Sequence, residues 1–219
     1  MNTNNKAKRI LCYGDSNTWG WIPSSMGTDR YPINNRWPGI LQEKLGNDYE
    51  IIEEGLGGRT TMFDDPRPEF PERNGCKTLP IILETHLPLD YVLLMLGTTD
   101  TKQMMDLSEV EITKGMAELI KIIKEYKILK GTSLPNILVI VPPIVKEEAD
   151  FASKLFKGST KKGNQLRQLY KELCKKEDVL YLDPTQEIET DSEEGVHIDA
   201  NNHEILANLI YTKIKESLN

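Results

Sequence analysis

The sequence is poor in residue types on which several protein classes depend. It contains only three cysteines, Cys12, Cys76 and Cys174, whose spacing fits neither a metal site nor a redox pair, so we expect each to pack as a small apolar side chain. It also contains only three histidines and no paired-histidine motif. We therefore expect no bound metal and no cofactor.

Positive charge and long apolar runs are scarce as well. Asp and Glu outnumber Lys and Arg by 34 to 27, which gives a formal net charge of −7, whereas a nucleic-acid-binding surface needs concentrated positive charge. No apolar run approaches the roughly 20 residues that span a bilayer, and the polar residues 1–6 do not resemble a signal peptide. We expect no nucleic acid partner, no membrane association and a cytoplasmic location.

The apolar residues that are present form short runs separated by helical patterns. The runs cover residues 9–13, 49–53, 91–96, 137–141 and 179–182. Strands that alternate with helices are typical of a parallel sheet covered on both faces. We predict a three-layer α/β/α sandwich, flavodoxin-like, with a five-stranded, mainly parallel sheet, and we assign residues 1–219 to a single domain.

Two of the helical patterns begin with recognisable N-terminal signals. Residues 108–111, Ser-Glu-Val-Glu, read as a capping box ahead of an apolar stripe. Asp199 is a suitable N-cap for the last helix, whose apolar residues recur at helical spacing. We expect both helices to pack their apolar stripes on the sheet.

Three long stretches lack regular periodicity: residues 20–35, 59–76 and 142–160. Loops of this length are uncommon in compact domains unless they form lids or binding walls. In an open α/β sheet the ligand lies beyond the carboxyl ends of the strands, where these stretches are predicted to emerge. We therefore expect the three loops to surround the functional site.

The candidate catalytic residues lie near the two ends of the chain. Residues 14–20, Gly-Asp-Ser-Asn-Thr-Trp-Gly, directly follow the first apolar run, so the hydroxyl of Ser16 would lie at an edge of the sheet. Residues 194–197, Glu-Gly-Val-His, place a carboxylate three residues before an imidazole. Ser16 as nucleophile, His197 as base and Glu194 as the acid that orients it would form a catalytic triad.

Charged residues beside these motifs are better explained by structural roles. We expect Asp15 and Asp100 to fix the turns in which they lie by accepting hydrogen bonds from backbone N–H groups. Arg59 could contact a neighbouring subunit or pair with the acidic residues 64–65.

The order of four motifs resembles the SGNH or GDSL hydrolase superfamily. The motifs are Gly-Asp-Ser at 14–16, Glu-Gly-Leu-Gly-Gly-Arg-Thr at 54–60, Leu-Gly-Thr-Thr-Asp at 96–100 and Gly-Val-His at 195–197. Further segments are similar to the bacterial arylesterase and acyltransferase branch, among them Arg-Trp-Pro-Gly at 36–39 and Thr-His-Leu-Pro-Leu-Asp at 85–90. The likeness extends over nearly the whole chain.

The resemblance implies a serine esterase that hydrolyses small-acyl, acetyl-type esters through an acyl-enzyme on Ser16. In this family the oxyanion is held by the N–H of the nucleophile, the N–H of a glycine in the second motif and a side chain of the third motif. These positions correspond to Ser16, Gly58 and Thr99. The resemblance also implies acyl transfer to alcohols, small-molecule ester and alcohol substrates, and a homo-oligomer.

Substrate contacts are expected from the apolar residues that follow the nucleophile. Trp19, Trp21 and Ile22 lie within six residues of Ser16 and would provide an apolar approach to its hydroxyl.

Two positions depart from the family pattern. The third motif ordinarily carries an asparagine where this chain has Thr99, so a planar amide donor is replaced by a shorter hydroxyl. Glu194 stands where the family usually has an aspartate, and its extra methylene requires the loop to retreat. These changes leave open a catalytically attenuated, ligand-binding member of the same fold.

A second alternative is a flavodoxin-like nucleotide or phosphate binder. Residues 14–18 could form an anion-binding turn after the first strand. However, the chain has neither a P-loop lysine nor dinucleotide-binding glycine spacing, and this function would leave His197 unexplained.

Overall fold

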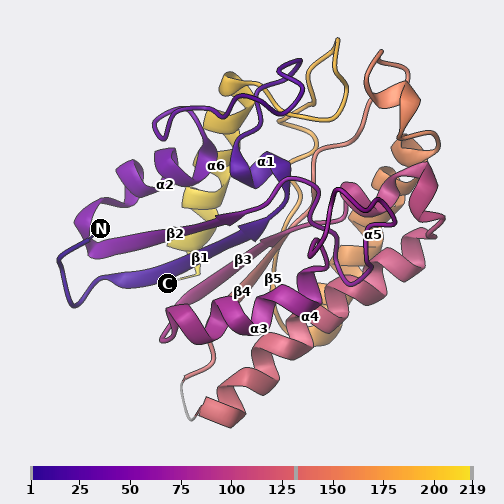
Figure 1. The fold of residues 1–219 in the computed structure, drawn as a ribbon. Helices are drawn as coiled ribbons and strands as arrows, with labels where there is room; N and C mark the ends of the chain where they lie inside the picture. The colour runs from indigo at the N-terminus through magenta and orange to yellow at the C-terminus, as the bar shows by residue number, and fades with distance from the viewer. Residues whose placement is uncertain (1, 131–132, 218–219) are drawn as a thin grey trace.

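The computed structural model describes residues 2–130 and 133–217. Five strands form one sheet in the order β2-β1-β3-β4-β5, and every neighbouring pair is parallel (Figure 1). The strands are β1 (Lys8–Gly14), β2 (Tyr49–Gly55), β3 (Tyr91–Met95), β4 (Asn136–Ile140) and β5 (Leu180–Leu182). The predicted five-stranded sheet is confirmed, and its strand order is that of the flavodoxin-like group.

Helices cover both faces of this sheet. The α-helices are α1 (Ser16–Trp19), α2 (Trp37–Leu45), α3 (Gly75–His86), α4 (Glu109–Lys130), α5 (Ser159–Glu177) and α6 (Ala200–Glu216). Short 3-10 helices are η1 (Gly46–Asp48), η2 (Thr99–Thr101), η3 (Gln103–Met105) and η4 (Ala152–Lys154). Helices α2 and α6 pack on one face and α3, α4 and α5 on the other, so the predicted three-layer sandwich is also confirmed (Figure 1).

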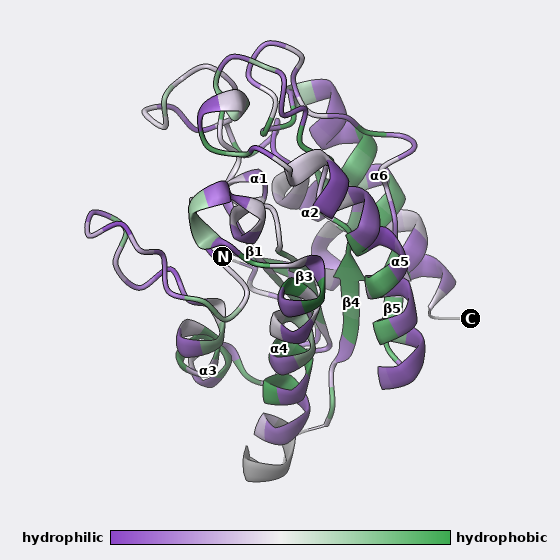
Figure 2. Cartoon of the chain, turned by 90° about the vertical axis from the view of Figure 1, so that its right-hand side faces the viewer, coloured by the Kyte–Doolittle hydropathy of each residue, from purple (hydrophilic) through white to green (hydrophobic). Residues whose placement is uncertain are grey.

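The strands are apolar because both of their faces are buried. Along β1, Ile10 and Cys12 join the core beneath α2 and α6, whereas Leu11 and Tyr13 join the core beneath α3, α4 and α5. Successive side chains of a strand point to opposite faces, so a strand covered on both sides needs apolar residues at consecutive positions. Figure 2 shows this as hydrophobic residues along β4 and on the flanking helices.

The two predicted helix starts are present. The N–H and hydroxyl of Ser108 donate to Glu111 Oε2 at 2.9 and 2.7 Å, and Glu111 N–H donates back to Ser108 Oγ at 3.2 Å. Asp199 Oδ1 accepts a hydrogen bond from Asn202 N–H at 2.8 Å and caps α6. These caps satisfy N–H groups that have no partner within the helix.

A buried carboxylate ties the loop after β2 to the turn after β3. Asp100 is fully buried in η2 and accepts hydrogen bonds from the N–H of Thr61 at 3.0 Å and from its hydroxyl at 2.6 Å. Burial raises the pKa of Asp100 to about 7, although the hydrogen bonds from Thr61 act in the opposite direction. Asp100 was predicted to fix the turn in which it lies; its carboxylate instead holds the loop that contains Thr61.

This burial predicts a pH-dependent stability. The folded protein holds the Asp100 proton more tightly than the unfolded chain does, so the free energy of unfolding should decrease as the pH rises from about 4 to about 7. In Asp100→Asn this contribution disappears, and the decrease in Tm between pH 5 and pH 8 should be smaller than in the wild type. Thermal unfolding followed by circular dichroism measures it. The exposed Asp48→Asn is the matched control, and an equal decrease in all three proteins would contradict the assignment.

Candidate active site

Ser16 lies at the point where β1 gives way to α1. Asp15 caps this short helix by accepting a hydrogen bond from Asn17 N–H at 2.9 Å, as predicted for a turn-fixing residue. The close approach of α1 requires Gly14, because a Cβ atom there would lie 2.0 Å from the hydroxyl oxygen of Thr18. The result is a sharp turn in which Ser16 is 7% exposed.

Glu194 and His197 share one tight turn before α6. Gly195 at its centre has φ +87°, in the left-handed region that favours glycine. One carboxylate oxygen of Glu194, Oε2, accepts the N–H groups of Val196 and His197 at 2.9 and 2.8 Å. The other, Oε1, lies 2.6 Å from His197 Nδ1. The extra methylene of glutamate is thus accommodated with both of its oxygens occupied.

The structure brings the three predicted side chains together in one hydrogen-bonded chain. His197 Nε2 lies 2.8 Å from Ser16 Oγ, although the two residues are 181 positions apart. Burial alone would raise the pKa of Glu194, but the hydrogen bonds that its carboxylate accepts from the His197 ring and from the N–H groups of His197 and Val196 outweigh it and lower that pKa below its usual value. Glu194 is therefore held ionised beside Nδ1, which leaves Nε2 free to accept the serine proton.

Asn17 is a positioning residue to which the sequence analysis assigned no role. Its Oδ1 accepts Ile198 N–H at 3.0 Å, and its Nδ2 donates to Val196 O at 3.3 Å. The side chain that follows the nucleophile thus holds the residues on both sides of His197. The available signal was a polar residue next to Ser16 in a segment predicted to be buried.

The indole of Trp21 covers one face of the imidazole. The two rings stack with their centroids 4.6 Å apart and an interplanar angle of 12°. Gly27 of the same loop supports the indole, since a Cβ atom there would lie 2.4 Å from the Trp21 ring. Trp21 was predicted to contact substrate, and its position also fixes the orientation of His197.

Gly58 and Thr99 face the same space as Ser16. Gly58 has φ +80°, and within residues 2–130 and 133–217 its N–H has no hydrogen-bond acceptor. Thr99 begins η2, is buried, and its hydroxyl likewise has no hydrogen-bond partner in the described part of the chain. Both groups are available to a ligand, as a role in oxyanion binding requires.

A cavity of about 460 Å³ opens over these residues. Its walls combine the serine and histidine with side chains from the long loops: Ser16, Trp19, Trp21, Met26, Gly27, Leu56, Gly57, Gly58, Arg67, Phe70, Arg73, Thr98, Thr99, Lys102, Phe151, Leu155, Phe156, Val196 and His197. Each of the three predicted loops contributes to the lining.

Ile22 is not among the residues that line this cavity, although it was predicted to contact substrate. Trp21 forms an isolated β-bridge with Arg30, and neighbouring side chains of an extended segment point in opposite directions. With Trp21 directed at His197, Ile22 is directed away. Met26, from the same loop, does line the cavity.

Arg59 corrects another expectation. It neither pairs with residues 64–65 nor reaches the surface: it is 3% exposed, its guanidinium lies 4.0 Å from the ring centre of Tyr13, and Nη1 donates to the backbone oxygens of Gly14 and Glu54. Arg59 therefore fastens the second motif to the end of β1 from within.

Residues 2–130 and 133–217 contain no cluster of three or more His, Cys, Asp or Glu side chains that could hold a metal ion. Within the same residues, no helix is both long enough and apolar enough to cross a membrane.

Comparison with known proteins places this site in a family. The model of the GDSL-like lipase/acylhydrolase family matches residues 12–205. The chain belongs to this family. The match includes all four motifs of the sequence analysis, so the family is the one that those motifs resembled.

Solved structures of GDSL-like proteins resemble the chain over nearly its whole length. A carbohydrate acetylesterase from Sinorhizobium meliloti is 37% identical, with 96% of this chain and 99% of that one covered and a TM-score of 0.89. An aryl esterase from M. smegmatis gives the same identity, coverage and TM-score. A lipolytic G-D-S-L family protein from Veillonella parvula, at 14% identity and a TM-score of 0.66, shares the fold. No curated protein sequence matches the chain.

The geometry of this GDSL-like site makes a prediction about the reactivity of Ser16. A fluorophosphonate probe should label Ser16, because His197 can remove the hydroxyl proton while the oxygen attacks phosphorus. Glu194→Gln should slow labelling by roughly 10² to 10⁴, since the neutral amide no longer stabilises the imidazolium. Mass spectrometry of the labelled protein measures the rate. The neighbouring, exposed Glu193→Gln should label like the wild type, and a similar loss in both variants would contradict the role of Glu194.

Proposed function

We propose that this protein is a serine esterase that cleaves small-acyl esters of the acetyl type. The observation that carries the proposal is the hydrogen-bonded chain from Ser16 through His197 to Glu194 at the floor of the cavity. The names of two relatives at 37% identity, a carbohydrate acetylesterase and an aryl esterase, support it.

In the proposed acylation step, His197 Nε2 takes the proton from Ser16 as Oγ attacks the ester carbonyl carbon. The carbonyl oxygen becomes an oxyanion, which the N–H groups of Ser16 and Gly58 and the hydroxyl of Thr99 stabilise. Collapse of this intermediate breaks the bond to the alcohol oxygen, and His197 returns the proton to that leaving group. The acyl group remains on Ser16.

In deacylation, His197 removes a proton from an incoming hydroxyl as its oxygen attacks the acyl-enzyme. Collapse of this second intermediate breaks the bond between the acyl carbon and Ser16 Oγ, and His197 returns the proton to Ser16. When the hydroxyl belongs to water the product is an acid, and when it belongs to an alcohol the product is a new ester. The apolar side chains of Trp21 and Phe151 lie against His197, with ring centres at 4.6 and 6.4 Å, and favour an organic acceptor over water at this position. We therefore include acyl transfer to alcohols in the proposal.

Stoichiometric protein mixed with p-nitrophenyl acetate should release a burst of phenolate equal to the concentration of active sites, because an acyl-enzyme forms on Ser16. Stopped-flow absorbance measures the burst, and Ser16→Ala should abolish it. Added ethanol should divert the acyl group into ethyl acetate, detectable by gas chromatography. Release no faster than that of the variant would refute the esterase, and a burst without ethyl acetate would refute only the transfer.

A catalytically attenuated, ligand-binding member of the fold is the second candidate, and the observation that favours it is Thr99. A hydroxyl reaches less far than the asparagine amide usual at this position, and loss of one oxyanion donor costs about 10² to 10³ in kcat. Glu194 does not favour this candidate, because its carboxylate lies 2.6 Å from His197 Nδ1.

Two substitutions at position 99 test whether the Thr99 hydroxyl donates a hydrogen bond to the oxyanion. If the Thr99 hydroxyl donates to the oxyanion, Thr99→Val should lower kcat by roughly 10² while keeping the side-chain shape. Thr99→Asn supplies the longer amide and should raise kcat above that of the wild type. Steady-state kinetics with p-nitrophenyl acetate measures both variants. An unchanged kcat in Thr99→Val would mean that the hydroxyl takes no part.

A further inference from the structure

The cavity over Ser16 carries an unbalanced positive charge. In the part of the chain that the structure describes, its lining includes three cations, Arg67, Arg73 and Lys102, and no aspartate or glutamate. The chain as a whole has a net charge of −7. Positive charge is thus concentrated in the one place where substrate is proposed to bind, on a protein that is otherwise acidic.

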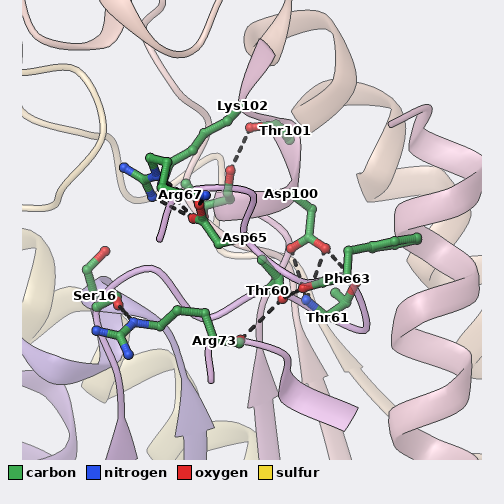
Figure 3. Close-up of polar contacts among 12 residues, drawn as sticks. Ser16, Thr60, Thr61, Phe63, Asp65, Arg67, Arg73, Asp100, Thr101 and Lys102 are labelled. Atoms are coloured by element: carbon green, nitrogen blue, oxygen red, sulfur yellow. Dashed lines mark hydrogen bonds and ion pairs between the residues drawn. The ribbon is translucent and has the colours of Figure 1, made fainter. Parts of the chain in front are cut away.

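One carboxylate behind the cavity wall partly compensates two of these cations. Asp65 Oδ1 and Oδ2 accept hydrogen bonds from Arg67 Nε and Nη2 at 2.8 and 2.6 Å. The same Oδ2 lies 4.0 Å from Lys102 Nζ, which is beyond hydrogen-bond distance. Figure 3 shows these three side chains together. Asp65 balances one unit of charge, and its bidentate geometry assigns it to Arg67.

Arg73 has no carboxylate partner within the described residues. Its Nε donates to Gly57 O and its Nη1 to Pro71 O, both at 2.8 Å, so its positive charge is not neutralised. A Cβ atom built on Gly58 would lie 3.8 Å from Arg73 Nε, which places the guanidinium beside the proposed oxyanion site. Three cations and the single carboxylate of Asp65 leave this wall of the cavity with two more positive than negative charges.

Lys102 is costly to keep charged, because its ammonium group is buried and its nearest carboxylate, Asp65, already accepts two hydrogen bonds from Arg67. Its side chain is only 8% exposed, and Nζ lies 5.7 Å from the ring centre of Phe156. Burial lowers the pKa of Lys102 to about 8, with the positive charge of Arg67 acting in the same direction and the carboxylates of Asp65, Asp15 and Asp100 acting against it. A buried ammonium gains most from a partner of opposite charge, and an anionic ligand would provide one.

We propose that the preferred ester of this enzyme carries an anionic group, such as a carboxylate, which binds between Arg73 and Lys102 while the ester carbonyl lies at Ser16. The inference rests on the proposed esterase function and narrows its substrate class. Arg67 contributes less, because Asp65 already neutralises it. Either the acyl half or the alcohol half of the ester can carry the charge, since both halves project into the same cavity.

Two matched pairs of esters test the preference. Ethyl hydrogen glutarate, with a carboxylate on the acyl half, is compared with ethyl valerate, and 4-acetoxybutanoate, with a carboxylate on the alcohol half, with butyl acetate. Turnover at neutral pH and low salt is followed by proton NMR. In at least one pair kcat/KM should be about tenfold higher for the charged ester, and the ratio should decrease as salt is added.

Substitutions that change the charge of the cavity wall then test whether this wall causes the preference for charged esters. Lys102→Met should lower the charged-to-neutral ratio about tenfold, and the exposed Lys161→Met on α5, which removes the same charge elsewhere, should leave the ratio unchanged. Asp65→Asn acts in the opposite direction: it removes the one compensating carboxylate and should raise the ratio. Equal kcat/KM values within both ester pairs, or equal effects of Lys102→Met and Lys161→Met, would overturn the anion site.

Measuring how the esters bind to the inactive Ser16→Ala variant tests the anion site separately from the esterase activity. Calorimetry on this variant should give a dissociation constant about tenfold lower for the charged ester than for its neutral partner, and the difference should disappear when Lys102→Met is added. If p-nitrophenyl acetate gives no Ser16-dependent burst, the esterase proposal fails, and the calorimetric difference alone decides on the anion site. Equal dissociation constants would reject that site.

Discussion

The parallel sheet is the constraint on which the rest of the structure depends. Because every strand runs in the same direction, the carboxyl ends of β1, β2 and β3 lie at one edge, and the segments that follow them meet there. This geometry brings Ser16, Gly58 and Thr99 around a single cavity although they come from three separate motifs. The turn that carries His197 is added from the far end of the chain, and Asn17 fastens it in place.

The fold and the hydrogen-bonded chain of the site could be predicted from the sequence. Buried parallel strands require continuous apolar runs, so β1 to β5 were recognisable within one or two residues of their observed bounds. Ser16, Glu194 and His197 lie in short motifs whose spacing fixes their local geometry. The length of Glu194 was expected to require a different loop position; in the structure its Oε1 lies 2.6 Å from His197 Nδ1.

The walls of the cavity could not be predicted in the same way. The loop over residues 56–74 has no periodicity, so its path depends on tertiary contacts such as that between Thr61 and Asp100, which no local pattern records. For the same reason Arg59 was expected to reach the surface although it is buried, and the presence of Arg73 and Lys102 in the lining of one cavity was not foreseen. The prediction for Ile22 was wrong for a local reason: the direction of its side chain depends on that of its neighbour Trp21.

The contact between Gly27 and the indole of Trp21 has an evolutionary consequence. On this side of the cavity the space for a side chain at position 27 is already taken by an aromatic ring that itself rests on His197. This wall cannot be reshaped without disturbing the base. Arg67 and Phe70 line the same cavity and stack on each other at 3.9 Å, and within the described residues neither forms a hydrogen bond or ring contact with Ser16, His197 or Glu194. Substitutions at these two positions would therefore change the shape of the cavity and leave the base in place.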